Sequence, residues 1–192
     1  MKMYECLYVF GYGALIWKPD IEYSDRKIGY IKGYQRRFWQ GSVEHRGTAE
    51  RWGRVATLIP SNNPEDKVWG IMYKVENKNN VAVQRGKLDN REKTLGEYET
   101  TEVEFFPRDT NDETLTATTY IALDTNRLFW KEENIDKQVN DIINAQGFAG
   151  PNIHYVTNLA DFLRNNVPEE DDQHLYELDR KLRDLYESGD EL

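Results

Sequence analysis

Residues 9–17 read Val-Phe-Gly-Tyr-Gly-Ala-Leu-Ile-Trp, so an apolar strand runs directly into a Gly-x-Gly turn and then into apolar residues again. Two glycines around one residue let the backbone bend until successive N–H groups point at one spot, which is the geometry of an anion-binding nest. The stretch lacks the third glycine of a dinucleotide fingerprint and the Gly-Lys-Ser/Thr ending of a P-loop. On spacing alone, a tight structural turn and a ligand cradle both stay open.

Short runs rich in Val, Ile, Tyr, Phe and Trp continue outward from this stretch and predict strands. The expected strands are 6–10, 28–33, 37–42, 54–59, 68–75, 98–106 and 114–123. Residues 77–93 interrupt the pattern and predict a helix, which Gly86 weakens by about 1 kcal/mol relative to Ala.

The last third of the chain changes to helical spacing. Apolar residues recur at three- and four-residue intervals in three groups: Ile135, Val139, Ile142 and Ile143; Val156, Leu159, Ala160 and Leu163; Leu175, Leu178, Leu182 and Leu185. Pro168 and the four acidic residues after it predict the start of the last helix, because acidic groups favour a helix N-terminus. With no internal repeat and no linker, the pattern predicts one α+β domain over residues 1–192, a mixed sheet or small barrel closed by C-terminal helices.

Composition narrows the functional classes. The chain has 192 residues, 25 Lys+Arg against 34 Asp+Glu for a formal charge of −9, and one cysteine. A single thiol excludes disulfide frameworks within the chain and clusters of thiolate metal ligands. The acidic balance argues against nucleic acid as a partner. The start, residues 1–5, lacks a secretory h-region, and no apolar run reaches the ~18 residues of a membrane span, so we expect a cytoplasmic protein without a membrane partner.

The charge is unevenly placed along the chain. Residues 26–54 contain eight basic and two acidic residues, a local excess of +6, whereas residues 169–192 contain ten acidic and three basic residues, a local −7. The N-terminal third is therefore basic, which matters if the ligand is a small anion.

Basic and aromatic residues interleave over residues 33–47, a pattern that can stack on and neutralise nucleic acid. Alternation along a strand would instead place Phe38 and Gln40 on one face and Arg37 and Trp39 on the other. A half-buried strand explains the pattern without a nucleic acid, and its end can contribute to a pocket.

Glu92 lies between Arg91 and Lys93, which is typical of a solvated helix end. General acid/base work by this carboxylate would need partial desolvation to raise its pKa above the ordinary value of about 4.3. The three histidines have no metal-ligand spacing, so structural or surface roles are expected for them. Cys6 lies in an apolar strand and is expected to be a small core residue.

Taken together, the motifs resemble the ChaC-like γ-glutamylcyclotransferases, in the glutathione-specific branch. The resemblance is ordered and nearly full length. It rests on residues 9–17, on Gly33-Tyr34 with 36–42 and 45–47, on 53–58, 68–70 and 88–93, on Gly150-Pro151-Asn152 with Tyr155, and on 167–170.

The resemblance implies a small mixed β-barrel of the γ-glutamylcyclotransferase type with C-terminal helices packed around it. It also implies an enzyme that cleaves glutathione to 5-oxoproline and cysteinylglycine with no cofactor and no metal. The α-amine of the substrate attacks its own γ-amide carbonyl, so positioning can supply much of the acceleration.

The family's functional residues map onto matching positions of this sequence. Glu92 is implied as the general base that later returns a proton to the leaving amine. The turn is implied to bind the γ-glutamyl group through backbone N–H groups, and its residues are Val9, Phe10, Gly11, Tyr12, Gly13, Ala14 and Leu15. Tyr155 is expected to line the same pocket. The family's Ser after Gly-Tyr-Gly is Ala14 here, and His154 replaces a usual Glu.

Three readings of function follow from the sequence. The first is the glutathione-cleaving enzyme, and the second keeps the fold but takes another γ-glutamyl compound. The third is a non-catalytic γ-glutamyl-binding module, which the change to Ala14 permits. A nucleic-acid binder is the least favoured.

Overall fold

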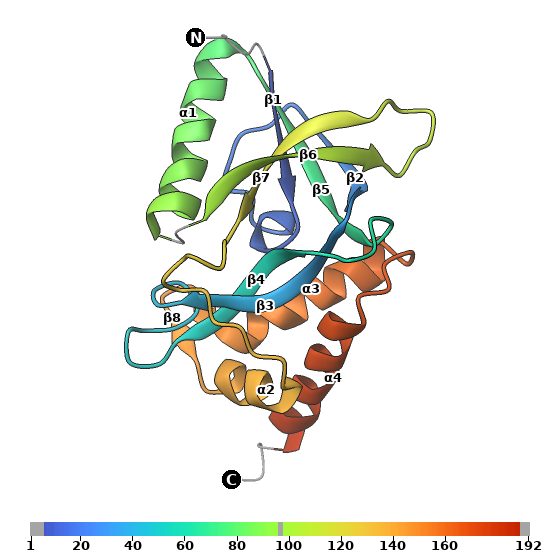
Figure 1. The fold of residues 1–192 in the computed structure, drawn as a ribbon. Helices are drawn as coiled ribbons and strands as arrows, with labels where there is room; N and C mark the ends of the chain where they lie inside the picture. Colours follow the sequence, from blue (N-terminus) through green and yellow to red (C-terminus); the bar gives the residue numbers. More distant parts are fainter. Residues whose placement is uncertain (1–5, 96–97, 189–192) are drawn as a thin grey trace. The chain divides into compact units, whose positions relative to one another are not determined.

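The computed structural model describes residues 6–95 and 98–188 (Figure 1). The chain divides into two compact units. Unit 1 consists of residues 1–35 and 58–126, and unit 2 consists of residues 36–57 and 127–192. Whether the two units act as one domain over residues 1–192 stays a prediction. The N-terminal residues 1–5, on which part of the localisation prediction rests, lie outside the described residues.

Unit 1 is a closed five-stranded barrel. Its strands follow the order β1 (Cys6–Gly11), β5 (Lys67–Glu76), β2 (Asp25–Lys32), β6 (Glu99–Pro107) and β7 (Leu115–Ile121). β1 pairs in parallel with β7, where Val9 faces Thr118, and the remaining pairs are antiparallel. The predicted small mixed barrel of an α+β protein is therefore confirmed.

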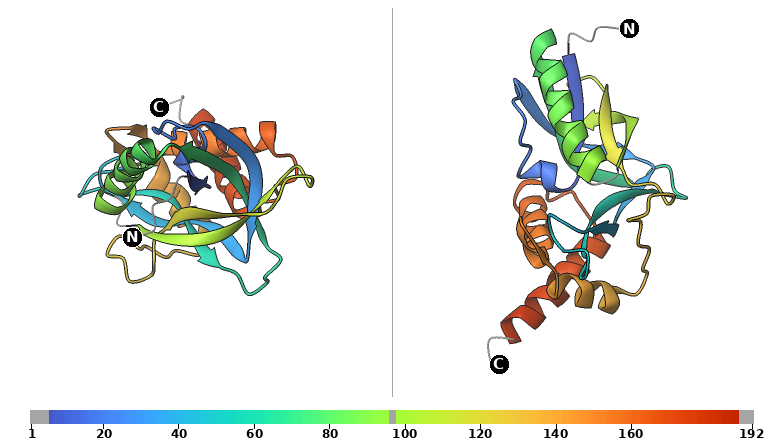
Figure 2. Two further views of the ribbon diagram at one scale, coloured as in Figure 1. Left: turned by 90° about the horizontal axis from the view of Figure 1, so that it is seen from above. Right: turned by 90° about the vertical axis from the view of Figure 1, so that its left-hand side faces the viewer.

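The barrel closes around large apolar side chains supplied by alternate positions of its strands. Phe10, Tyr73 and Phe105 are completely buried. Helix α1 (Lys78–Leu88) packs against β1 and β5 on the outside of the barrel (Figure 2), and it continues as a π-helix, η2 (Asp89–Leu95). Residues of α1, β1, β5 and β7 share one hydrophobic cluster. The helix predicted over 77–93 is confirmed, with a change of helical type near its end.

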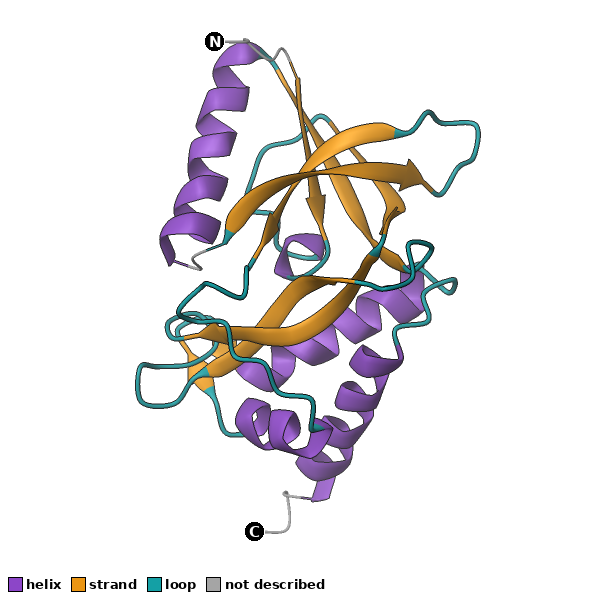
Figure 3. Cartoon of the chain, viewed as in Figure 1, coloured by secondary structure: helices purple, strands orange, loops and turns teal. Residues whose placement is uncertain are grey.

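Unit 2 is built on a two-stranded ribbon and three helices (Figure 3). The ribbon consists of β3 (Tyr34–Ser42) and β4 (Gly53–Pro60), whose outer ends extend into unit 1. The helices are α2 (Ile135–Ile143), α3 (Asn152–Asn166) and α4 (Gln173–Ser188), and α3 packs against both α2 and α4. A short hairpin of β8 (Gln146–Gly147) and β9 (Gly150–Pro151) precedes α3.

The last helix begins later than the acidic run predicts, because the acidic residues before it have other partners. α4 starts at Gln173, and the Asp172 side chain caps it by accepting from the Leu175 N–H at 3.0 Å. Asp172 also pairs with the buried Arg36 at 2.7 Å, and Glu170 approaches the same guanidinium at 3.4 Å. These two carboxylates are therefore buried partners of a strand arginine and not part of a solvated helix face.

A second buried arginine fixes the other end of the ribbon. Arg54 donates to the carboxylate of Asp141 and to the carbonyl oxygens of Phe38 and Trp130 at 2.8–3.1 Å. Its guanidinium lies 3.6 Å from the centre of the Trp130 ring. Arg36 and Arg54, two of the eight basic residues of segment 26–54, are therefore buried and already paired. The local excess of +6 overstates the charge available to a ligand.

The Gly-Pro-Asn motif at the start of α3 also has a structural role. The Asn152 side chain is completely buried, accepts from the Arg54 N–H at 2.6 Å and donates to the Arg54 carbonyl at 2.8 Å. The amide therefore pairs with both backbone groups of one residue and joins the first turn of α3 to β4.

The expected strands and helices are all present, with boundaries shifted by a few residues. The short 3-10 helix after β1 and the β8–β9 hairpin are additions that the apolar pattern does not indicate. None of the helices in residues 6–95 and 98–188 is long and apolar enough to cross a membrane.

Gly86 lowers the stability of helix α1 relative to alanine. It is exposed within α1, and a Cβ added there meets no atom within 4 Å. We expect Gly86→Ala to raise the free energy of unfolding by about 0.5–1 kcal/mol, because it lowers the backbone entropy of the unfolded chain. Urea denaturation followed by circular dichroism measures this change. Gly11→Ala is the matched control and should destabilise, because its Cβ would lie 2.6 Å from the Leu15 Cβ. An unchanged or lower stability of Gly86→Ala contradicts the prediction.

Candidate active site

The glycine turn that follows β1 is a close approach of two chain segments. A side chain at Gly11 would collide with Leu15, because an added Cβ lies 2.6 Å from the Leu15 Cβ. The chain therefore turns at once into a short 3-10 helix, η1 (Ala14–Ile16). Neither Gly11 nor Gly13 has a positive φ, so the requirement for glycine at position 11 is steric.

Hydroxyl groups from the barrel hold this turn in place. The buried Tyr73 hydroxyl donates to the Leu15 carbonyl at 2.8 Å, and burial raises the pKa of Tyr73 to about 12. The Tyr12 hydroxyl donates to the Tyr120 carbonyl at 2.6 Å, and the Thr119 hydroxyl donates to the Phe10 carbonyl at 3.0 Å. The turn is therefore a rigid part of the barrel.

The hydrogen bonds of η1 occupy the carbonyl groups at its start. The Gly13 carbonyl accepts from the Ile16 N–H at 2.9 Å, and the Ala14 carbonyl accepts from the N–H groups of Trp17 and Lys18. A 3-10 turn leaves the first N–H groups without a partner inside the turn. N–H groups at the start of a turn are suited to an anion, which is the geometry expected of a carboxylate cradle.

Glu92 lies on η2, the π-helical continuation of α1. Its side chain is only 16% exposed, and its Oε1 lies 3.1 Å from Nε of Arg91. Burial raises the pKa of the Glu92 carboxyl above its ordinary value, and the Arg91 guanidinium opposes that rise. Glu92 is thus the partly desolvated carboxylate that general acid/base catalysis requires, and not a solvated helix end.

A second carboxylate of η2 has a different environment. Asp89 accepts from the Tyr120 hydroxyl at 2.9 Å and lies 3.4 Å from the Lys93 ammonium. Burial and this hydrogen bond raise the pKa of Tyr120, so its hydroxyl stays a donor at neutral pH. The two carboxylates of η2 are therefore distinguished, since Asp89 is paired and Glu92 faces a single guanidinium.

Unit 1 brings the glycine turn and the segment that carries Glu92 together. Leu15 of η1, Leu88 at the end of α1 and Tyr98 after η2 belong to one buried cluster. Tyr120 joins the same two segments, because its carbonyl accepts from Tyr12 and its hydroxyl donates to Asp89. Residues about 80 positions apart in sequence thus meet beside the barrel strands β1 and β7, and this region is the candidate active site.

Tyr155 belongs to unit 2, where its environment can be described. It lies on α3 and is 5% exposed, and its hydroxyl accepts from the Ala56 N–H at 3.2 Å. Its ring makes an edge contact with Phe38, and the Arg46 guanidinium lies 6.0 Å from its centre. The contact of Tyr155 with a γ-glutamyl group stays a prediction.

The histidines lie in different environments, and Cys6 is a half-buried free cysteine at the start of β1. Burial lowers the pKa of His174 to about 4, so its imidazole is neutral beside Phe38. His45 lies against Phe148 with the two rings tilted and their centres 4.5 Å apart, and His154 is exposed. Within the part of the chain that the structure describes, no group of three or more His, Cys, Asp or Glu side chains gathers to hold a metal ion.

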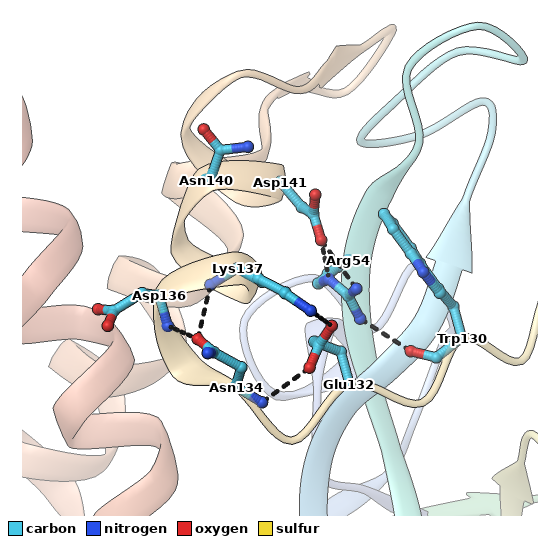
Figure 4. A pocket seen from close by; sticks show the side chains of 8 residues that line it. All are labelled: Arg54, Trp130, Glu132, Asn134, Asp136, Lys137, Asn140 and Asp141. Atoms are coloured by element: carbon cyan, nitrogen blue, oxygen red, sulfur yellow. Dashed lines mark hydrogen bonds and ion pairs between the residues drawn. The ribbon is translucent and has the colours of Figure 1, made fainter.

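A pocket of about 440 Å³ lies in unit 2. Its polar groups pair with one another, as Figure 4 shows: Arg54 with Asp141, and Lys137 with Glu132. The Asn134 side chain caps α2 by accepting from two backbone N–H groups. The pocket residues therefore serve to anchor α2, and none of them is a candidate for acid/base work on the substrate.

Sequence reasoning missed the contacts that Arg91 makes. Its Nη1 donates to the Lys18 carbonyl at 2.8 Å and lies 3.1 Å from the Asp20 carboxylate. The position of Arg91 beside Glu92 could have indicated an ion pair, but nothing in the sequence indicates Asp20.

Known proteins resemble this chain over most of its length. The family model described as ChaC-like protein matches residues 7–185. The glutathione-specific gamma-glutamylcyclotransferase 1 of Rattus norvegicus is 41% identical over 171 residues, which cover 89% of this chain and 76% of the relative. The protein of the same name from Danio rerio is 41% identical over 178 residues, covering 92% and 88%. The glutathione-specific gamma-glutamylcyclotransferase of Schizosaccharomyces pombe is 34% identical and covers 92% of each chain.

The fold is similar to a solved structure of the yeast gamma-glutamyl cyclotransferase specific to glutathione. That match has a TM-score of 0.86 at 27% identity and covers 94% of this chain and 97% of the yeast chain. The barrel described above is therefore a γ-glutamylcyclotransferase fold.

The raised pKa of Glu92 has a consequence for stability. The unfolded chain ionises this carboxyl near its ordinary pKa of 4.5, before the folded chain does, so the wild type loses stability as pH rises from that value through the folded pKa. We expect Glu92→Gln to be more stable than the wild type at about pH 7, with the difference vanishing at about pH 4. Urea denaturation at both pH values measures it. A variant less stable than the wild type only at the higher pH is the opposite result.

Proposed function

The chain belongs to the ChaC-like protein family, and we propose that it is an enzyme that cleaves glutathione to 5-oxoproline and cysteinylglycine. The observation that carries the proposal is the buried Glu92 carboxyl on η2, a segment flanked by Leu88 and Tyr98, which share a buried cluster with Leu15 of η1. Relatives named for this activity cover most of the chain. The substrate is a small molecule, and composition keeps a cytoplasmic location as the expectation.

The reaction needs no external nucleophile, because the substrate carries it. The α-amine of the γ-glutamyl group attacks the γ-carbonyl carbon and forms the new C–N bond of the five-membered lactam. The C–N bond to cysteinylglycine then breaks, and the leaving amine takes up a proton. Well-oriented intramolecular reactions reach effective molarities of about 10⁵–10⁸ M, so holding the γ-glutamyl arm in a bent conformation supplies much of the acceleration.

Glu92 is suited to move both protons. The α-amine is a nucleophile only after its ammonium form loses a proton, and a carboxylate with a raised pKa accepts that proton more readily than an exposed one. The protonated carboxyl then returns the proton to the departing amine. The single guanidinium beside Glu92 keeps the carboxyl from being held entirely in its neutral form.

The glycine turn is proposed to bind the γ-glutamyl group. Backbone N–H groups at the start of η1 would hold the α-carboxylate and stabilise the negative charge that develops on the carbonyl oxygen, as an oxyanion hole does. Val9, Phe10 and Gly11 set the position of the turn through the β1 ladder. Tyr73 and Tyr120 hold it rigid, which limits the reorganisation needed in the transition state.

Tyr155 is the residue of unit 2 for which we infer a substrate contact from the family resemblance. Its hydroxyl accepts the Ala56 N–H, so it is held in a fixed orientation on α3. A fixed phenol is suited to positioning a polar group and not to proton transfer, since the ordinary pKa of tyrosine is about 10.

The decisive experiment compares wild type and Glu92→Gln for release of 5-oxoproline and cysteinylglycine from glutathione. We expect the wild type to form both products in equal amounts and the variant to lose about 10²–10⁴-fold in kcat, because the proton acceptor is gone. Glu102→Gln, which changes an exposed carboxylate on β6, is the matched control and should behave as the wild type.

Each other outcome has a clear meaning. A folded wild type that binds glutathione without turnover indicates a binding module. A wild type that prefers another γ-glutamyl compound in side-by-side competition keeps the chemistry and changes the substrate. Equal activity of Glu92→Gln and wild type contradicts the role of Glu92.

Ala14 tests how the turn contacts the substrate. If the contact is made by backbone N–H groups, the side chain at this position matters little. We expect Ala14→Ser to change kcat/KM by less than about threefold, well below the ~1–3 kcal/mol of a hydroxyl contact. Steady-state kinetics with glutathione measures it. A tenfold or larger gain in kcat/KM would show that the family serine binds through its hydroxyl.

A further inference from the structure

Arg91 joins two segments of unit 1 that are far apart in sequence. Its side chain is 21% exposed, and its Nε lies 3.1 Å from Oε1 of Glu92. On its other side, Nη1 donates to the Lys18 carbonyl at 2.8 Å and lies 3.1 Å from Oδ2 of Asp20. One guanidinium therefore contacts both the carboxyl of the proposed base and the chain that leaves the glycine turn.

These contacts continue directly into η1. The Lys18 N–H donates to the Ala14 carbonyl at 2.8 Å, and the Lys18 carbonyl accepts from Arg91. A continuous series of polar contacts thus runs from Ala14 through Lys18 and Arg91 to Glu92. On the barrel side, the Tyr73 hydroxyl holds η1 through the carbonyl groups of Leu15 and Ile16. The turn is therefore fixed by Tyr73 on one side and by Arg91 on the other.

We call the contacts of Arg91 with Glu92, Lys18 and Asp20 the Arg91 bridge. The local backbone supports this bridge. Side chains of successive residues do not face each other on a regular α-helix, yet those of Arg91 and Glu92 meet on the π-helical η2. The outer partner, Asp20, has a φ of +52°, a left-handed conformation that Asp tolerates better than most residues. An Asp at this position supplies both the unusual backbone and the carboxylate.

The other titratable groups of this region contact residues other than Glu92. Lys93 and the Tyr120 hydroxyl both contact Asp89. The carboxylates of Asp89 and Glu92 on η2 raise the pKa of Tyr120, and Arg85 on α1 lowers it. Among residues 6–95 and 98–188, Arg91 is the cation that is paired with Glu92.

We propose that Arg91 is a positioning residue that holds the Glu92 carboxyl at a fixed place relative to the glycine turn, with Asp20 as its outer anchor. The proposal deepens the proposed function and rests on it for the catalytic role of Glu92. The bridge fixes the separation between the proton acceptor and the turn that binds the γ-glutamyl group. It does so without touching the substrate.

The bridge has two separable parts. The charge of Arg91 stabilises ionised Glu92, and the planar guanidinium with its several donors provides the geometry, which a lysine ammonium does not reproduce. Arg91→Gln removes both parts, Arg91→Lys keeps the charge, and Asp20→Asn keeps the Arg91–Glu92 pair but weakens its outer anchor. Asn also tolerates a positive φ, so Asp20→Asn preserves the backbone.

The first experiment does not depend on activity. Protein carrying ¹³C-labelled glutamate is titrated by NMR, and the Glu92 carboxyl signal is assigned by its loss in Glu92→Gln. We expect the Glu92 pKa to rise in Arg91→Gln and to stay near the wild-type value in Arg91→Lys. Asp20→Asn should leave that pKa unchanged or lower it, since it removes a competing carboxylate. An unchanged Glu92 pKa in Arg91→Gln overturns the proposal.

The second experiment measures kcat and KM for glutathione across pH with the same variants. We expect Arg91→Gln to lose about tenfold or more in kcat/KM. The acidic limb of its pH–rate profile, where activity falls as Glu92 becomes protonated, should move to higher pH. Arg91→Lys should keep the acidic limb and lose mainly kcat, and Asp20→Asn should lose a few-fold in kcat with the limb in place. Asp112→Asn, which breaks the surface pair with Lys27, is the control for loss of an aspartate.

The two experiments separate the proposals. A wild type without turnover refutes the proposed function, while the NMR titration still decides whether Arg91 and Glu92 are coupled. A normal acidic limb and unchanged kcat in Arg91→Gln refute the positioning role even in an active enzyme. Circular dichroism of each variant confirms the fold. If Arg91→Gln fails to fold, the losses in kcat expected of Arg91→Lys and Asp20→Asn carry the test, and unchanged kcat in both overturns the positioning role.

Discussion

The turn after β1 forms only because no side chain stands between Gly11 and Leu15. That close approach sends the strand directly into η1, where the Tyr73 hydroxyl and the Lys18–Arg91 contact can reach it. The start of η1 therefore has N–H groups in a fixed place, next to a barrel strand. A larger residue at position 11 would displace the turn, and with it the segment to which Arg91 and Glu92 are joined.

Both units contain buried charged side chains, but these differ in how completely they are paired. In unit 2, Arg36 and Arg54 are surrounded by carboxylates and carbonyl oxygens, so each is fully compensated and serves to join strands to loops and helices. In unit 1, Glu92 faces one guanidinium that also contacts Asp20 and a backbone carbonyl. Burial raises the pKa of the Glu92 carboxyl above its ordinary value, and the Arg91 guanidinium opposes that rise only in part. The paired charges of unit 2 therefore build the structure, whereas the partly compensated Glu92 is the residue for which we propose a role in catalysis.

Residues in and beside two motifs of the family resemblance make structural contacts. Asn152 is completely buried because its amide pairs with both backbone groups of Arg54. Glu170 and Asp172, which suggest a solvated helix start, are partners of Arg36. Local patterns could not reveal these pairings, because the partners lie about 100 residues or more apart, and only the folded chain brings them together.

Alternation and spacing in the sequence determined the strands, the helices and their order, since burial of apolar side chains at periods of 2 and 3.6 residues depends on local sequence. The motif order also determined the family, and with it Glu92 and residues 9–15 as candidates. The tertiary structure decided that Glu92 is desolvated, that Arg91 bridges it to Lys18 and Asp20, and which basic residues are already consumed. The physical reason is that a pKa and a hydrogen bond depend on neighbours in space. Asp20 and Glu92 are separated by more than 70 residues. Arg91 therefore contacts both of them only in the folded chain.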